Sequence, residues 1–198
     1  MGGWDVGPGL DGDLTVKIRK LGLKVVHEPT AACYTHVPDS FRKLARQRYR
    51  WDRSMVRFRM RKHRDVLLPS ASFRLRNFLS SAENIFFNFL LNLKWWVYIF
   101  QIMIFHPTQL PVIVFINYVL YTLANVIEVA VAMALFGRSL RPVEARMFLF
   151  VPLVPLYTGF YLRVVRTFAY LMELIHGASY LDRWNPWKVS RVARRERL

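Results

Sequence analysis

Hydrophobic and polar residues follow different patterns in the two parts of the chain. Up to about residue 62 the apolar positions recur with the spacing of amphipathic elements, whereas from residue 85 they form long continuous runs. Runs of about twenty apolar residues match the thickness of a bilayer core. The pattern divides the chain into residues 1–38, 39–84, 85–175 and 176–198, and it predicts a membrane region that follows a more polar one.

The first segment begins with a predicted loop and a short helix. Residues 1–12 hold five of the nine glycines, so a loop that approaches a ligand closely is expected there. Apolar positions at i, i+4 and i+7 from Leu14 predict a helix, with Asp13 as its N-cap and Gly22 as its end. The same residues also allow a plain loop and N-cap without a catalytic role.

Two extended stretches follow this helix. Residues 23–27 resemble a strand that Pro29 closes, and residues 31–36 allow a second one before Pro38. Loop, helix and strand together predict a partial α/β element that cannot complete a sheet by itself. Because no leader-like apolar run precedes it, we expect residues 1–38 to be the C-terminal piece of a larger cytosolic domain.

A single basic helix is predicted over residues 39–62, capped by Asp39 or Ser40. Its apolar stripe includes Phe41 and Trp51, and eleven Lys and Arg residues lie between positions 42 and 64. Such a helix suits the surface of an anionic bilayer. A solvated basic face and a nucleic-acid face are the alternatives; we expect lipid and no nucleic acid, because apolar spans follow some twenty residues later.

Three apolar segments are expected to meet the bilayer, at residues 85–105, 112–136 and 147–175. Basic residues are concentrated before the first segment and again at 137–146, whereas the turn at 106–109 has none. By the positive-inside tendency, the first two segments form a hairpin that enters from the cytosol. The basic tail, residues 176–198, is cytosolic only if the third segment is re-entrant or interfacial; a full third span would place the tail outside.

The second apolar segment carries a line of polar residues on one helix face. Their spacing is i, i+4, i+8 and i+11, and the four residues are Asn117, Tyr121, Asn125 and Glu128. Polar groups at membrane depth normally face a bundle interior or a water-filled path. This face therefore either lines a channel for a polar substrate or forms hydrogen bonds between helices.

Composition and charge narrow the class of protein. Of the 198 residues 54% are hydrophobic, more than an ordinary soluble globule contains, and the net charge is +16. Nucleic acid, anionic lipid or a phosphorylated substrate could each balance that charge. Cys33 is the single cysteine, which excludes an internal disulfide, and the five histidines lack metal-ligand spacing and are interpreted as strand, loop or interface residues.

Several short motifs occur in an order that is typical of one enzyme group. They are Gly2-Gly3-Trp4-Asp5, Asp11-Gly12-Asp13-Leu14-Thr15, Thr35-x-x-Pro38 and Gln47-Arg48-Tyr49-Arg50-Trp51. The chain resembles the C-terminal half of a processive family 2 membrane glycosyltransferase, the group that includes the hyaluronan, chitin, cellulose and poly-N-acetylglucosamine synthases. Gln47, Arg50 and Trp51 match the Q-x-x-R-W motif of that group. The resemblance covers residues 1–62 by motif and the remainder by architecture.

The resemblance implies roles for individual residues. Asp11 matches the general base that deprotonates the acceptor hydroxyl, although Leu10 stands where the family usually has an acidic residue. Arg50, with Gln47 on the same face, would hold the leaving diphosphate, and Trp51 would support the acceptor sugar or anchor the helix in the interface. Alternatively, Asp11 and Asp13 form a D-x-D pair that binds Mg²⁺ or Mn²⁺.

The expected function is that of the acceptor-side and channel portion of an inverting glycosyltransferase in the cell or plasma membrane, with its motif region on the cytosolic face. Its partners would be a nucleotide-sugar donor, a growing β-linked glycan, and a missing N-terminal half that supplies most of the metal ligands. By itself the chain should be inactive. A lipid-directed enzyme similar to ceramide glucosyltransferase and a non-enzymatic basic membrane protein are the alternatives.

Overall fold

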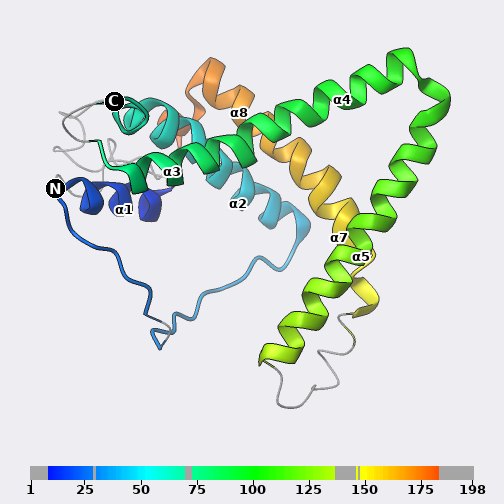
Figure 1. Ribbon diagram of the computed structural model, residues 1–198, viewed down its shortest axis with the longest axis horizontal. Helices are drawn as coiled ribbons and strands as arrows, with labels where there is room; N and C mark the ends of the chain where they lie inside the picture. Colours follow the sequence, from blue (N-terminus) through cyan, green and yellow to red (C-terminus); the bar gives the residue numbers. More distant parts are fainter. Residues whose placement is uncertain (1–8, 29, 70–72, 137–145, 147, 183–198) are drawn as a thin grey trace. The chain divides into compact units, whose positions relative to one another are not determined.

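The computed structural model describes residues 9–28, 30–69, 73–136, 146 and 148–182, and it divides into two compact units (Figure 1). The first unit consists of residues 1–92 and 165–198 and the second of residues 93–164. Within the described ranges every regular element is a helix. The α-helices are α1 (Leu10–Lys20), α2 (Phe41–Ser54), α3 (Leu75–Asn84), α4 (Leu91–Phe105), α5 (Leu110–Phe136), α7 (Leu153–Pro155) and α8 (Leu162–His176).

Wider and tighter helical segments connect or extend these α-helices. The π-helical segments are η1 (Met55–Lys62), η3 (Ile85–Leu90) and η6 (Leu156–Tyr161). The 3-10 segments are η2 (Arg64–Leu67), η4 (Pro107–Gln109), η5 (Phe148–Phe150) and η7 (Ala178–Leu181).

The predicted α/β element is wrong for the residues that the structure describes. Residues 23–28 and 31–39 are irregular and largely exposed, with Val26 at 81% and Tyr34 at 97% exposure. A strand needs a neighbouring strand to satisfy its backbone N–H and C=O groups. The β-like composition of 23–27 and 31–36 finds no such neighbour in the described chain, so both stretches stay extended and unpaired.

Helix α1 begins earlier than its apolar spacing predicts. It starts at Leu10 after Gly9, whose φ of 85° lies in the left-handed region that glycine adopts readily. Asp13 is therefore in the body of the helix, and the prediction that it is the N-cap is wrong. The end is as expected, because the chain leaves the helix through Gly22, with a φ of 80°. Residues 1–8 of the predicted loop lie outside the described residues.

The basic helix predicted over 39–62 is confirmed as the continuous pair α2 and η1. Ser40 is extended and its hydroxyl accepts a hydrogen bond from the Lys43 backbone N–H, as an N-cap does. Met55 and Phe58 of the apolar stripe are buried, whereas Phe41 at the start of the stripe is exposed. The last turns of this helix thus form a core, and the first turns lie at the surface of their unit.

Two glycines let α1 approach this core very closely. A Cβ atom on Gly12 would lie 2.8 Å from Cζ of the buried Phe58 ring, and one on Gly9 would meet Cβ of Ser54 and lie 2.7 Å from its Oγ. Only glycine allows backbone to pack this tightly on a side chain. The Gly9 and Gly12 spacing therefore brings the first turn of α1 against the junction of α2 and η1.

Replacing Gly12 with valine should lower the free energy of unfolding by about 1–3 kcal/mol, because the new side chain overpacks the site against Phe58. The thermal unfolding midpoint of the purified chain in detergent measures the change. Gly159→Val is the matched control, since no heavy atom lies within 4 Å of a Cβ placed there. A similar loss in both variants would contradict this account of the glycine.

The end of α8 closes back onto η1 through a buried carboxylate. Glu173 is fully buried and accepts hydrogen bonds from the Ser179 backbone N–H and hydroxyl, both at 2.7 Å. Arg61 donates to the Glu173 carbonyl at 2.9 Å, which satisfies one of the last carbonyls of the helix. These contacts join segments more than one hundred residues apart and complete the first unit.

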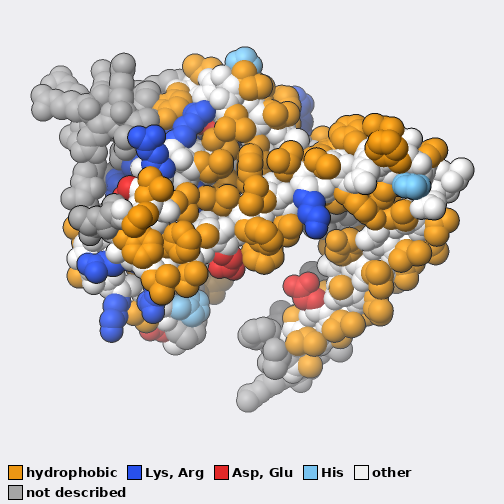
Figure 2. Space-filling view, turned by 45° about the horizontal axis from the view of Figure 1, so that its top comes forward, with side chains coloured by type: hydrophobic (Ala, Val, Ile, Leu, Met, Phe, Trp, Pro, Cys, Tyr) orange, Lys and Arg blue, Asp and Glu red, His pale blue; other side chains and the backbone are white. Residues whose placement is uncertain are grey.

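Two helical stretches are long and apolar enough to cross a membrane, and they indicate that the protein associates with one. They are Leu75–Phe105 and Pro107–Ala134. The predicted spans at 85–105 and 112–136 fall inside them, and the first stretch begins ten residues earlier than expected. Figure 2 shows hydrophobic side chains covering the part of the second unit that faces the viewer, in agreement with exposed residues such as Phe115 and Leu120.

The third predicted segment, residues 147–175, is helical from Leu153 but does not qualify as a membrane-length helix within the described residues. In the second unit it packs against α5 through α7, where the Tyr118 hydroxyl donates to the Pro152 carbonyl at 3.1 Å. Most of the loop at 137–146, and residues 183–198 of the basic tail, lie outside the described residues.

Candidate functional site

A cavity of about 430 Å³ lies in the first unit, where α1, α2, α3 and α8 meet. Asp11 enters it from the first turn of α1, and Trp51 enters it from α2. This volume is within the range of pockets that bind small molecules. The structure thus brings two of the residues singled out in the sequence to one cavity, although they are forty positions apart.

The glycine contacts explain how Asp11 reaches this cavity. Gly9 and Gly12, which flank Asp11, also line it, and their close approach to Ser54 and Phe58 fixes the first turn of α1 there. The Asp11 side chain is exposed, and its backbone carbonyl accepts a hydrogen bond from the Thr15 hydroxyl at 2.8 Å. A solvated carboxylate at the mouth of a polar cavity is able to accept a proton.

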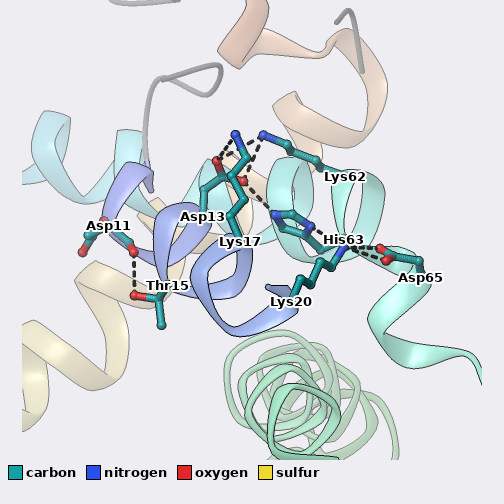
Figure 3. Close-up of polar contacts among 8 residues, drawn as sticks. All are labelled: Asp11, Asp13, Thr15, Lys17, Lys20, Lys62, His63 and Asp65. Carbon is teal, nitrogen blue, oxygen red and sulfur yellow. Dashed lines mark hydrogen bonds and ion pairs between the residues drawn. The ribbon is translucent and has the colours of Figure 1, made fainter. Parts of the chain in front are cut away.

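Asp11 and Asp13 lie on different sides of α1, as Figure 3 shows. Residues two positions apart on a helix do not face each other. The carboxylate of Asp13 is fully buried and is surrounded by cationic or donor groups. The D-x-D alternative for a divalent ion therefore does not fit this geometry, and the described residues contain no group of three or more potential metal ligands.

Asp13 instead ties α1 to the end of η1. Its Oδ1 atom lies 2.7 Å from Nε2 of His63 and its Oδ2 atom 3.1 Å from Nζ of Lys62, while Lys17 lies 3.3 Å away (Figure 3). Burial by itself raises the pKa of Asp13, but the hydrogen bonds from His63 and Lys62 outweigh it and hold that pKa far below its ordinary value. The carboxylate is thus charged and firmly held.

The histidine of this cluster carries a defined proton arrangement. Lys20 Nζ lies 3.0 Å from His63 Nδ1 and also 2.6 Å from a carboxylate oxygen of Asp65. An ammonium group is a donor only, so Nδ1 accepts and Nε2 carries the proton that it donates to Asp13. The sequence alone suggested no special role for His63, and its burial at 4% exposure decides that it is a structural residue.

The face of α2 that lines the cavity consists of Arg48, Trp51 and Asp52. These positions are three and four residues apart and so share one side of the helix. Arg50 is two residues from both Arg48 and Asp52, which turns it away, and neither Arg50 nor Gln47 lines the cavity. The guanidinium of Arg48 stacks over the Trp51 ring at 5.1 Å.

The opposite wall contains residues that the sequence motifs do not include. Asn84 and Asn88 come from the end of α3 and from η3, and Arg166 and Tyr170 come from α8. Arg166 Nε lies 3.3 Å from Asp52 Oδ1, and although this arginine opposes it, burial raises the pKa of Asp52. The spacing of the two asparagines, four apart at the start of an apolar run, was the available signal for this wall.

Comparisons of the chain with protein-family models, with curated proteins and with solved structures found no match. The interpretation of the cavity therefore depends on the chemistry of its own residues.

Many cations of the basic helix contact protein groups of the first unit. Arg53 forms a 2.6 Å ion pair with Asp182, Arg57 stacks on Tyr180 at 4.3 Å, and Arg59 donates to the Ser80 carbonyl. Arg53 and Arg57 are buried, at 4% and 3% exposure. Much of the positive charge in α2 and η1 thus serves internal packing, which the sequence pattern of an interfacial helix did not predict.

The polar face of α5 belongs to the second unit. Asn117 and Asn125 donate their side-chain amides to the carbonyls of Ile113 and Tyr121, one turn earlier. Tyr121 and Glu128 are exposed on the same helix. The interpretation of these four residues as a channel lining stays a prediction.

Proposed function

We propose that this chain supplies the acceptor side of an inverting membrane glycosyltransferase. The observation that carries the proposal is the shared cavity of Asp11 and Trp51, the two residues whose motifs resemble the general base and the acceptor platform of such enzymes. The polar wall and the membrane-length helices are consistent with a hydrophilic acceptor handled at a membrane. The position of the cavity on the cytosolic face of a cell or plasma membrane is part of the proposal.

The chemistry assigns one step to Asp11. An acceptor hydroxyl held against Trp51 attacks the anomeric carbon of a nucleotide-sugar, and Asp11 takes the proton of that hydroxyl. The new C–O bond forms as the bond to the diphosphate breaks, and the negative charge leaves with the diphosphate. Displacement from one side inverts the anomeric centre, so an α-linked donor gives a β-linked product.

Cationic groups near the cavity would stabilise the leaving diphosphate. Arg48 and Arg166 line the cavity, whereas Gln47 and Arg50 do not, so their proposed role in diphosphate binding depends on the resemblance alone. A guanidinium suits this task because its planar fork matches a phosphate. The described carboxylates do not form a divalent-ion site, and no step is assigned to a metal here.

The test is incorporation of labelled sugar by membranes that contain the intact protein. Radiolabelled UDP-glucose and UDP-N-acetylglucosamine are supplied in parallel, with membranes lacking the protein as control. We expect one of them to give a water-soluble polymer that resists lipid extraction. A product found wholly in the lipid extract would favour the lipid-directed alternative, and no incorporation from any nucleotide-sugar would overturn the proposal.

A further inference from the structure

We infer that Asn84 and Asn88 are specificity-determining residues that bind hydroxyl groups of a saccharide acceptor in the cavity. The inference rests on the proposed function and deepens it, because it selects a sugar chain rather than a lipid alcohol as the acceptor. Neither asparagine belongs to the motifs that suggested the activity.

Both asparagines are placed to present an acceptor oxygen to a ligand. They line the cavity together with Asp11 and Trp51, and each is partly buried. The Asn84 amide nitrogen donates to the Ser80 carbonyl at 2.8 Å, and that of Asn88 donates to the Asn84 carbonyl at 3.1 Å. Because the nitrogen end of each planar amide is directed to its own helix, the oxygen end is turned away from that helix carbonyl.

The helix geometry supports a paired role for the two side chains. Asn84 ends α3 and Asn88 lies in η3, so the two are four residues apart across the start of a π-helical segment. Residues four apart share a helix face. π-helical turns inside longer helices occur frequently at functional sites. Two amide oxygens, one above the other, match neighbouring hydroxyl groups on a sugar ring.

The rest of the cavity selects the same chemistry. Trp51 offers a flat apolar surface, and the carboxylates of Asp11 and Asp52 are further acceptors of hydrogen bonds. A ring with an apolar C–H face and an edge of O–H donors satisfies all of these groups at once. The alkyl part of a lipid alcohol would instead leave the buried acceptors without partners, which costs binding free energy.

The experiment measures acceptor affinity in the intact protein carrying Asn84→Leu or Asn88→Leu. The probes are short β-linked oligomers of glucose and of N-acetylglucosamine, tested by equilibrium binding in detergent and as acceptors in the transfer assay. Each substitution should raise the acceptor Kd and KM about tenfold, the loss of roughly one hydrogen bond, while the KM for the nucleotide-sugar stays unchanged. Phe87→Leu, an exposed position on the same helix, is the control.

The outcomes separate this inference from the proposed function. Transfer by the wild type with unchanged acceptor Kd and KM in both variants would overturn the inference and leave the function standing. Absence of transfer from every nucleotide-sugar would overturn the function and this inference with it. If a leucine variant shows a lowered unfolding midpoint, Asn84→Ser and Asn88→Ser replace it, because serine is small enough to fit and too short to reach the ligand.

Discussion

Replacing Asp11 with asparagine is expected to lower sugar transfer by at least about 10²–10⁴-fold, the usual contribution of a general base. Asparagine has the shape of aspartate but does not accept the proton of the attacking hydroxyl. The fold should persist, because the Asp11 side chain is exposed and its backbone carbonyl, not its carboxylate, holds Thr15. The measurement is kcat for labelled-sugar incorporation by the intact protein, together with the Kd of the nucleotide-sugar.

Asp39→Asn is the matched control for this change. Asp39 is 71% exposed, pairs with Lys43 at 2.7 Å and does not line the cavity. Transfer in that variant should equal that of the wild type, and nucleotide-sugar binding should persist in both variants. Turnover retained in Asp11→Asn would dismiss Asp11 as the base.

Replacing Asp13 with asparagine is expected to cost about 3–5 kcal/mol of folding free energy, the typical penalty for breaking a buried ion pair. The substitution would leave the ammonium groups of Lys62 and Lys17 without their counter-charge in a nearly dry site, where Lys62 is 6% exposed. Asp39→Asn is again the control, because a solvent-exposed pair contributes less than about 1 kcal/mol. Thermal unfolding of the purified chain in detergent gives both values.

The same carboxylate predicts a specific dependence on pH. Its folded-state pKa lies below the ordinary value of 3.8, so its contribution to stability is complete above that pH and is lost as the pH falls toward the folded-state pKa. The difference in unfolding free energy between wild type and Asp13→Asn should therefore be constant from neutral pH down to about 4 and shrink below it. A difference that does not change in acid would contradict the charged state assigned to Asp13.

Together the two aspartates separate chemistry from architecture. Asp11→Asn should remove transfer without changing stability, whereas Asp13→Asn should reduce both, since Asp13 holds α1 against η1 and thereby positions Asp11. The two residues are adjacent in the D-x-D pattern, yet the helix directs one to the cavity and the other to the core. A metal-binding role would require both variants to behave alike, with loss of activity alone.

Local patterns in the sequence were sufficient for several elements. The spacing of apolar residues and the Ser40 cap predicted the helix at 39–62, which the structure confirms as α2 and η1. Gly22 was correctly predicted as the end of α1, and the apolar runs at 85–105 and 112–136 correspond to the two membrane-length helices. Each of these features depends on interactions between residues a few positions apart, which is why the sequence contains the signal.

The predicted strands failed for a related reason. The composition of residues 23–27 favours extended backbone, and the backbone there is indeed not helical, but a strand exists only when a second segment accepts its hydrogen bonds. Such pairing is not a property of the segment itself. Asp13 was likewise assigned from local spacing as an N-cap, while its actual partners, Lys62 and His63, are about fifty residues away.

The sequence by itself determined which segments become helices and which of them are apolar enough for a bilayer, because hydrophobic periodicity and capping act over one or two turns. Tertiary structure alone decided that Asp11 and Trp51 line one cavity, that Arg48 rather than Arg50 faces it, and that Asn84, Asn88 and Arg166 complete its wall. Those placements follow from close packing at Gly9 and Gly12 and from the buried Asp13 cluster, and both require contacts between distant segments.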